Sequence, residues 1–229
     1  VYFDLEVSNN GKILDIGAVN QNGDIFHSSI LGEFLKFISS AEYLCGHNIV
    51  SHDFKYLKPF LKKSYKLIDT LYLSPILFPE RPYHNLVKDD KIISDQLNNP
   101  LSDSLKAKQL FEDEFERFKD LPENIKRSYY DLLNEKDHFK GFFEYAQYSS
   151  NRFSYLFNSK ADNISEILKG MVCSKANISH IIESAPTELA YALAIIRTGD
   201  RYSITPAWVK HQFPLVDNII HTLRVINCG

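Results

Sequence analysis

Three short stretches at the start of the chain are rich in apolar and β-branched residues, which is typical of strands: residues 2–6, 13–19 and 25–28. In the first of them, apolar and polar residues alternate from Phe3 to Glu6, as in a strand with one buried face. Asn22-Gly23, between the second and the third stretch, is a strong signal for a tight turn between two strands. The chain is therefore expected to open with an antiparallel meander.

Two further apolar stretches, at residues 43–46 and 67–71, are short enough to be buried strands. Between the strands, residues 31–38 carry apolar side chains at helical spacing, which predicts a helix with one apolar face. A second helix is expected after residue 51, because Ser51 is a suitable N-cap. The first half of the chain thus mixes strands and helices.

Helical patterns dominate the rest of the chain. A short helix is expected at residues 83–88, and Asn99 followed by Pro100 is a good start for a long one. After Pro122, apolar and aromatic stripes at helical spacing continue to the end, and such stripes are typical of packed cores. We expect a helical extension over residues 121–229.

Composition places the chain among ordinary globular proteins. Of its 229 residues, 44% are hydrophobic and 24% are charged, and no stretch resembles a membrane span or a secretory signal. Cys45, Cys173 and Cys228 are odd in number and far apart, which favours reduced thiols and a cytoplasmic location. The chain begins inside a strand without a methionine and stops after a helical pattern, so a fragment of a longer protein is expected.

Asp4 and Glu6 are the first candidates for chemistry. They stand two positions apart on the first predicted strand, so both carboxylates leave the same face. Like charges on one face of a core strand are costly unless a cation lies between them. Oxygen ligands favour Mg²⁺ or Mn²⁺. The alternative is a strand end whose acids face water.

Three other features gain weight only beside such a pair. Asp53 and Asp103 each fall in the first turn of a predicted helix, where an acid also simply compensates the helix dipole. Between residues 55 and 66, five lysines occur without any acid. Such a run is usually a solvated face, but beside a metal site it could contact a phosphate backbone. Lys62 and Lys63 are the candidates for this contact.

The order of these motifs resembles the DEDD, or DnaQ-like, 3′–5′ exonuclease superfamily. The resemblance covers roughly residues 1–120. Within the superfamily, this part of the chain is most similar to the N-terminal exonuclease module of bacterial RecQ-like helicases. The matching motifs are Phe3-Asp4-Leu5-Glu6, Asn48 with His52-Asp53, Ile68-Asp69-Thr70-Leu71, and Asn98 to Asp103.

The resemblance implies an α/β fold with a ribonuclease-H-like mixed sheet and flanking helices, followed by the helical extension. It implies Asp4, Glu6, Asp53 and Asp103 as ligands of two Mg²⁺ or Mn²⁺ ions, which hydrolyse terminal phosphodiesters of DNA. Leu5 and Asn48 are expected near the substrate, with Asn48 fixing a carboxylate or a water. The implied partners are single-stranded DNA or 3′ ends, and a helicase part of the same polypeptide.

The third motif departs from the family pattern. One branch of the family has a histidine general base five residues before the last aspartate, where this chain has Asn98, and an amide cannot take a proton from water near neutral pH. His84 could substitute for it, or could lie on the surface of the short helix expected at residues 83–88. Two other functions stay open: a weakly active or inactive module that binds DNA ends, and an exoribonuclease.

Overall fold

The computed structural model describes residues 1–86, 99–149, 159–173, 177–199 and 204–225. The chain divides into two compact units that interleave along the sequence. Unit 1 consists of Val1–Tyr72, Asn85–Phe115 and Asp137–Tyr145, and unit 2 consists of Leu73–His84, Glu116–Lys136 and Ala146–Gly229. The expected boundary near residue 120 stays a prediction.

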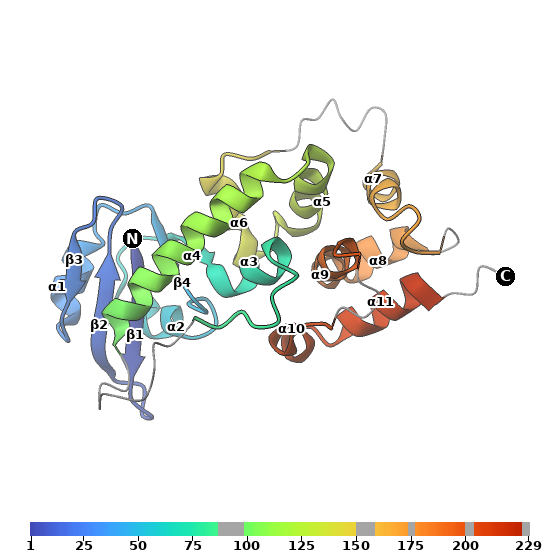
Figure 1. Cartoon of the computed structure of the whole chain (residues 1–229). Coiled ribbons are helices and arrows are strands. Elements are labelled where there is room, and N and C mark those ends of the chain that lie inside the picture. Colours follow the sequence, from blue (N-terminus) through green and yellow to red (C-terminus); the bar gives the residue numbers. More distant parts are fainter. Residues whose placement is uncertain (87–98, 150–158, 174–176, 200–203, 226–229) are drawn as a thin grey trace. The chain divides into compact units, whose positions relative to one another are not determined.

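Unit 1 is built on a five-stranded mixed sheet in the order β3-β2-β1-β4-β5 (Figure 1). The first three strands pair antiparallel, whereas β4 is parallel to both β1 and β5. The α/β class, the mixed sheet with flanking helices and the opening meander are confirmed. The strands are β1 (Tyr2–Val7), β2 (Ile13–Val19), β3 (Ile25–His27), β4 (Tyr43–Gly46) and β5 (Lys66–Asp69).

The two faces of β1 meet different helices. Phe3 and Leu5 are buried in a hydrophobic core that includes Phe34 of α1 (Leu31–Phe37). Tyr2 is on the opposite face, and its ring lies 5.9 Å from that of Phe111 in α4 (Pro100–Asp120). Because side chains alternate along a strand, Asp4 and Glu6 share the face that α4 covers.

Helix α6 (Asp137–Tyr145) lies against β5, the last strand of the sheet. A Cβ atom at Gly141 would be 2.1 Å from the carbonyl oxygen of Leu67, so only glycine allows the helix to approach this closely. An edge strand presents unpaired backbone groups to solvent unless another element covers them. Here α6 provides that cover.

Three expectations for this region are wrong in detail. Helix α2 (Asp53–Leu57) has His52 at its N-cap, and Ser51 instead bonds the hydroxyl of Tyr72 at 2.9 Å. The stretch expected as a strand at residues 67–71 becomes helical at Thr70, where α3 (Thr70–Leu77) begins directly after β5. The described part of the short helix expected at residues 83–88 is not helical. A 3₁₀ turn, η1 (Lys58–Phe60), follows α2.

Unit 2 is helical in its described part, which confirms the helical C-terminal part. Residues 189–196 of α9 are all buried and form the centre of its core. Its helices are α5 (Glu123–Leu133), α7 (Lys160–Ile167), α8 (Ile178–Ser184), α9 (Pro186–Arg197), α10 (Ala207–Gln212) and α11 (Leu215–Val225).

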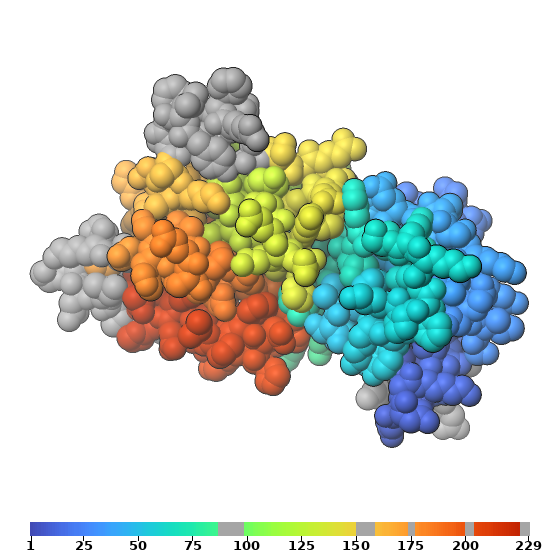
Figure 2. Space-filling view, turned by 180° about the vertical axis from the view of Figure 1, so that it is seen from behind, coloured from blue at the N-terminus to red at the C-terminus, as the bar shows by residue number. Residues whose placement is uncertain are grey.

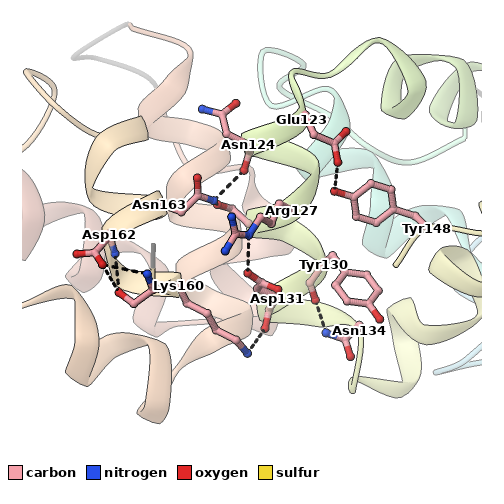
Figure 3. A network of polar contacts seen from close by, with 12 residues as sticks. Glu123, Asn124, Arg127, Tyr130, Asp131, Asn134, Tyr148, Lys160, Asp162 and Asn163 are labelled. Atoms are coloured by element: carbon pink, nitrogen blue, oxygen red, sulfur yellow. Dashed lines mark hydrogen bonds and ion pairs between the residues drawn. The ribbon is translucent and has the colours of Figure 1, made fainter. Parts of the chain in front are cut away.

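Polar contacts join α5 and α7 within unit 2 (Figure 3). The amide of Asn163 donates to the carbonyl of Asn124 at 3.0 Å and to the hydroxyl of Ser128 at 2.8 Å. Lys160 donates to the carbonyl of Asp131 at 3.2 Å. Since buried polar groups are costly when unpaired, these bonds fix the register between the two helices.

The cysteines differ from each other. Cys45 is a free, buried thiol, and burial raises its pKa well above the ordinary value. Cys173 is disulfide-bonded, so the expectation of three reduced thiols is wrong for this residue. Separation along the sequence does not determine distance in the folded chain.

Candidate functional site

The carboxylate of Asp53 lies beside the strand that carries Asp4 and Glu6. Its Oδ1 atom accepts the backbone N–H of Leu5 at 3.2 Å, and Leu5 is the residue between those two acids. Asp53 is 2% exposed, and burial raises its pKa, although the neighbouring His52 and the Leu5 N–H oppose the shift. The structure therefore brings the second motif next to the first.

Asp69 bonds the backbone of the turn that precedes Asp53. Its carboxylate is fully buried and accepts backbone N–H groups from Asn48 at 2.8 Å, Val50 at 2.9 Å and Leu71 at 3.1 Å. Asn48 has a φ of 65°, a left-handed conformation that asparagine tolerates better than most residues. Burial raises the pKa of Asp69 to about 7 against the effect of these donors. The turn between β4 and α2 is thus fastened from the end of β5.

Two more side chains strengthen this turn. The hydroxyl of Thr70 donates to the carbonyl of Gly46 at 3.3 Å and lies 2.9 Å from Nδ1 of His47. Sequence reasoning noted Asp69 and Thr70 only as parts of a family motif and gave them no role. The signal that could have found them is their place at the end of a buried strand, directly before a helix.

The start of α4 lies on the face of the sheet that carries Asp4. Gly17 of β2 is directly opposite Asp4 in the antiparallel pair, and a Cβ atom at Gly17 would be 2.0 Å from the backbone nitrogen of Leu101. Opposite residues of such a pair are about 5 Å apart and point to the same face. The backbone nitrogen of Leu101 is therefore within about 9 Å of the Asp4 backbone. Figure 1 shows the start of α4 next to β1 and β2.

Asp103 is in the first turn of α4, half-buried. The predicted start of this helix is confirmed, because the side chain of Asn99 accepts the N–H groups of Leu101 at 3.1 Å and Ser102 at 3.2 Å. Elements carrying all four candidate carboxylates thus meet at one region of unit 1. Convergence of the carboxylates themselves on two ions stays a prediction.

The donor types at this region fit Mg²⁺ or Mn²⁺, since Asp4, Glu6, Asp53 and Asp103 offer only oxygen atoms. Within the residues that the structure describes, no group of three or more His, Cys, Asp or Glu side chains is arranged to hold a metal ion.

His52 is a neighbour of the site that sequence reasoning noted only as part of a family motif. Its Nδ1 atom is 3.5 Å from Oδ1 of Asp53, and about half of its side chain is exposed. The hydrogen bond to Asp53 raises the pKa of His52, and the charge of Glu6 acts in the same direction. Acids of both the first and the second motif, Glu6 and Asp53, therefore favour the protonated form of His52.

The two candidates for general base remain untested in that role. Asn98 lies outside the described residues. His84 belongs to unit 2 and is buried rather than on a helix surface, with Nδ1 2.9 Å from the hydroxyl of Ser74. Burial lowers the pKa of His84 to about 4, so its ring is neutral near pH 7.

The lysine run has mixed roles, and Figure 2 shows the cyan segment that carries it at the surface of unit 1. Lys63 donates to the carbonyls of Ser39 at 2.7 Å and Ala41 at 2.8 Å, and so stabilises the chain after α1. Lys62 is exposed. Substrate contacts of Lys62 and Lys63 stay a prediction, with a structural role now established for Lys63.

No protein-family model, curated protein or solved structure matches the chain. Among the described helices, none is long and apolar enough to cross a membrane.

Proposed function

We propose that the chain is a divalent-metal-dependent 3′–5′ exonuclease of the DEDD type, acting on DNA ends. The sheet supports this proposal: the order β3-β2-β1-β4-β5, with β2 antiparallel to its neighbours, is compatible with a ribonuclease-H-like arrangement. The motif order in the sequence supports it as well.

One observation carries the proposal. The carboxylate of Asp53, which is 47 residues beyond Glu6 in the sequence, bonds the backbone between Asp4 and Glu6. The bond stabilises the Asp53 carboxylate, but it also holds this buried acid beside a strand that already carries two acids, and like charges repel. A cation shared by these carboxylates would offset that repulsion.

Each residue then has a defined task. Asp4, Glu6, Asp53 and Asp103 would hold the ions, which supply Lewis-acid chemistry for attack on a terminal phosphodiester when bound. The N–H of Leu5 orients the Asp53 carboxylate. Asp69 positions the turn before Asp53, and Asn99 caps the helix that carries Asp103.

The test is digestion of oligodeoxynucleotides labelled at the 3′ or the 5′ end, with Mg²⁺, Mn²⁺ or EDTA. We expect metal-dependent release of the 3′ label as mononucleotide and a ladder from the 5′ label. Asp4→Ala should abolish cleavage while the circular dichroism spectrum is retained. Cleavage by a well-folded Asp4→Ala protein at the wild-type rate would refute the proposal.

Two other results point to different functions. Binding of DNA ends without cleavage, in either metal, would indicate an inactive end-binding module. Cleavage restricted to oligoribonucleotides would indicate an exoribonuclease. The first is distinguished by measuring cleavage of single-stranded DNA with Mn²⁺ together with binding of the same DNA, and the second by running the same labelled sequences as DNA and as RNA.

A further inference from the structure

A groove of about 480 Å³ lies in unit 1, and its lining includes Phe54, the residue after Asp53. One wall is formed by α2 and η1, and the other by α6. Tyr65, directly before β5, and Lys66, its first residue, also line the groove. The close contact at Gly141 sets the position of the second wall. The volume is within the range of small-molecule sites, about 300–1,000 Å³.

The lysines that line the groove differ in how they are paired. Lys66 bonds Glu42 at 2.8 Å and Glu144 at 3.1 Å, so its charge is already compensated. Lys58 and Lys140 are exposed and make no ion pair with another described residue. Asp137 is the remaining acid of the lining. Two lysines, one on each wall, are thus available to an anion.

The groove also offers flat apolar surface. Phe54 and Tyr65 line it and are half-buried, and Tyr65 is held in place because its hydroxyl donates to the carbonyl of Ile38 at 3.3 Å. Proteins that bind single-stranded nucleic acids combine cations, which contact the phosphates, with aromatic rings, on which the bases stack.

The groove adjoins the proposed catalytic residues along α2. Phe54 directly follows Asp53, and Lys58 is five residues beyond Asp53, about 8 Å along a helix at 1.5 Å per residue. That distance is comparable to one nucleotide of an extended strand. A strand whose end reaches Asp53 can therefore place its next nucleotides in the groove.

We propose that this groove binds a single-stranded nucleic-acid segment next to the candidate site, with phosphates at Lys58 and Lys140 and a base against Phe54. The inference rests on the proposed function and adds the path of the substrate. It also redirects the lysine hypothesis from Lys62 and Lys63 to Lys58 and Lys140.

The test measures affinity for a fluorescent oligothymidylate by anisotropy, in EDTA so that no cleavage occurs, at salt concentrations from about 50 to 200 mM. The double variant Lys58→Gln/Lys140→Gln is compared with Lys36→Gln/Lys136→Gln, which removes the same charge at two exposed positions outside the groove. The slope of log affinity against log salt is negative. Its magnitude should decrease by about 0.7 per lost phosphate contact in the first variant and stay unchanged in the second.

Phe54→Leu tests the stacking contact separately. It keeps an apolar side chain and should weaken binding about tenfold at every salt concentration without changing the slope. Circular dichroism spectra confirm that each variant is folded.

The outcomes separate the two proposals. If the two double variants have equal salt slopes, or lose affinity for the oligothymidylate equally, the groove does not bind the strand and this proposal is wrong. A groove-specific slope change in a protein that never cleaves DNA upholds the groove and overturns the exonuclease. A protein that cleaves DNA, but whose groove variant binds like its control, upholds the exonuclease and overturns the groove.

Discussion

At the scale of single residues, Asp69 is the buried acid on which the order of the candidate site depends. Asp69→Asn keeps one acceptor oxygen but turns an NH₂ group toward backbone donors, so at least one of the three N–H groups is left unpaired. We expect a loss of about 1–3 kcal/mol in the free energy of unfolding, as is typical for a buried unsatisfied donor. Urea unfolding measures it.

The same variant should lower metal-dependent cleavage by more than its loss of stability explains, because the turn before Asp53 loosens. Asp113→Asn, an exposed acid on α4, is the control. An Asp69→Asn protein that is as stable and as active as this control would show that the turn holds without the carboxylate.

His84 predicts a dependence of stability on pH. Its pKa is lowered from 6.5 to about 4 in the folded chain, because burial disfavours the charged ring. The unfolded chain therefore takes up a proton below about pH 6.5 that the folded chain refuses, and stability falls as the pH drops from 6.5 toward 4. At pH 5 the loss should be roughly 1–2 kcal/mol.

Urea unfolding at pH 7.5 and at pH 5.0, for wild type and His84→Gln, isolates this contribution. The variant keeps a polar partner for Ser74 and has no ring to protonate, so its stability should decline less on acidification. Parallel declines in the two proteins would mean that His84 is accessible enough to be protonated in the folded state.

At the scale of elements, the contact between β2 and α4 predicts the effect of Gly17→Ala. The added Cβ would be 2.0 Å from backbone nitrogen, which cannot yield as a flexible side chain would, so the start of α4 must shift. Because Asp103 is in that first turn, we expect metal-dependent cleavage to fall at least tenfold, alongside a loss of about 1–3 kcal/mol in stability.

Gly32→Ala is the matched control for this variant. Gly32 is in α1 with no atom within 4 Å of the added Cβ, so the substitution should be neutral or stabilise by about 0.5–1 kcal/mol. Full activity in Gly17→Ala would show that α4 does not position a residue of the site.

Strands and helix starts were accessible to sequence reasoning, since both follow from local patterns. The alternation in β1 placed Asp4 and Glu6 on one face, and Asn99 was recognisable as a cap. The cap at Ser51 was wrong, because the hydroxyl of Tyr72, 21 residues away, competes for its side chain. The place of Asp69 at the end of a buried strand could mark it as a candidate, but its role could not be predicted, because two of its three donors come from a turn that only the folded chain brings to it.

At the scale of the whole molecule, metal binding should increase the free energy of unfolding. A ligand that binds only the folded chain adds about 2.7 kcal/mol at a hundred times its dissociation constant. Mn²⁺ or Mg²⁺ should therefore raise the melting temperature of the wild type, and this increase should be absent in Asp4→Asn. Scanning calorimetry with Ca²⁺ omitted measures both. Equal shifts in the two proteins would locate the ion elsewhere.

The cover that α6 gives to β5 has a consequence for synthesis of the chain. The edge of β5 is complete once Asp69 is made, but α6 follows only about 70 residues later, which takes roughly 4–15 s at 5–20 residues per second. During that interval the nascent sheet has an open edge able to pair with other chains. Slower translation between these segments should therefore increase aggregation of the newly made protein.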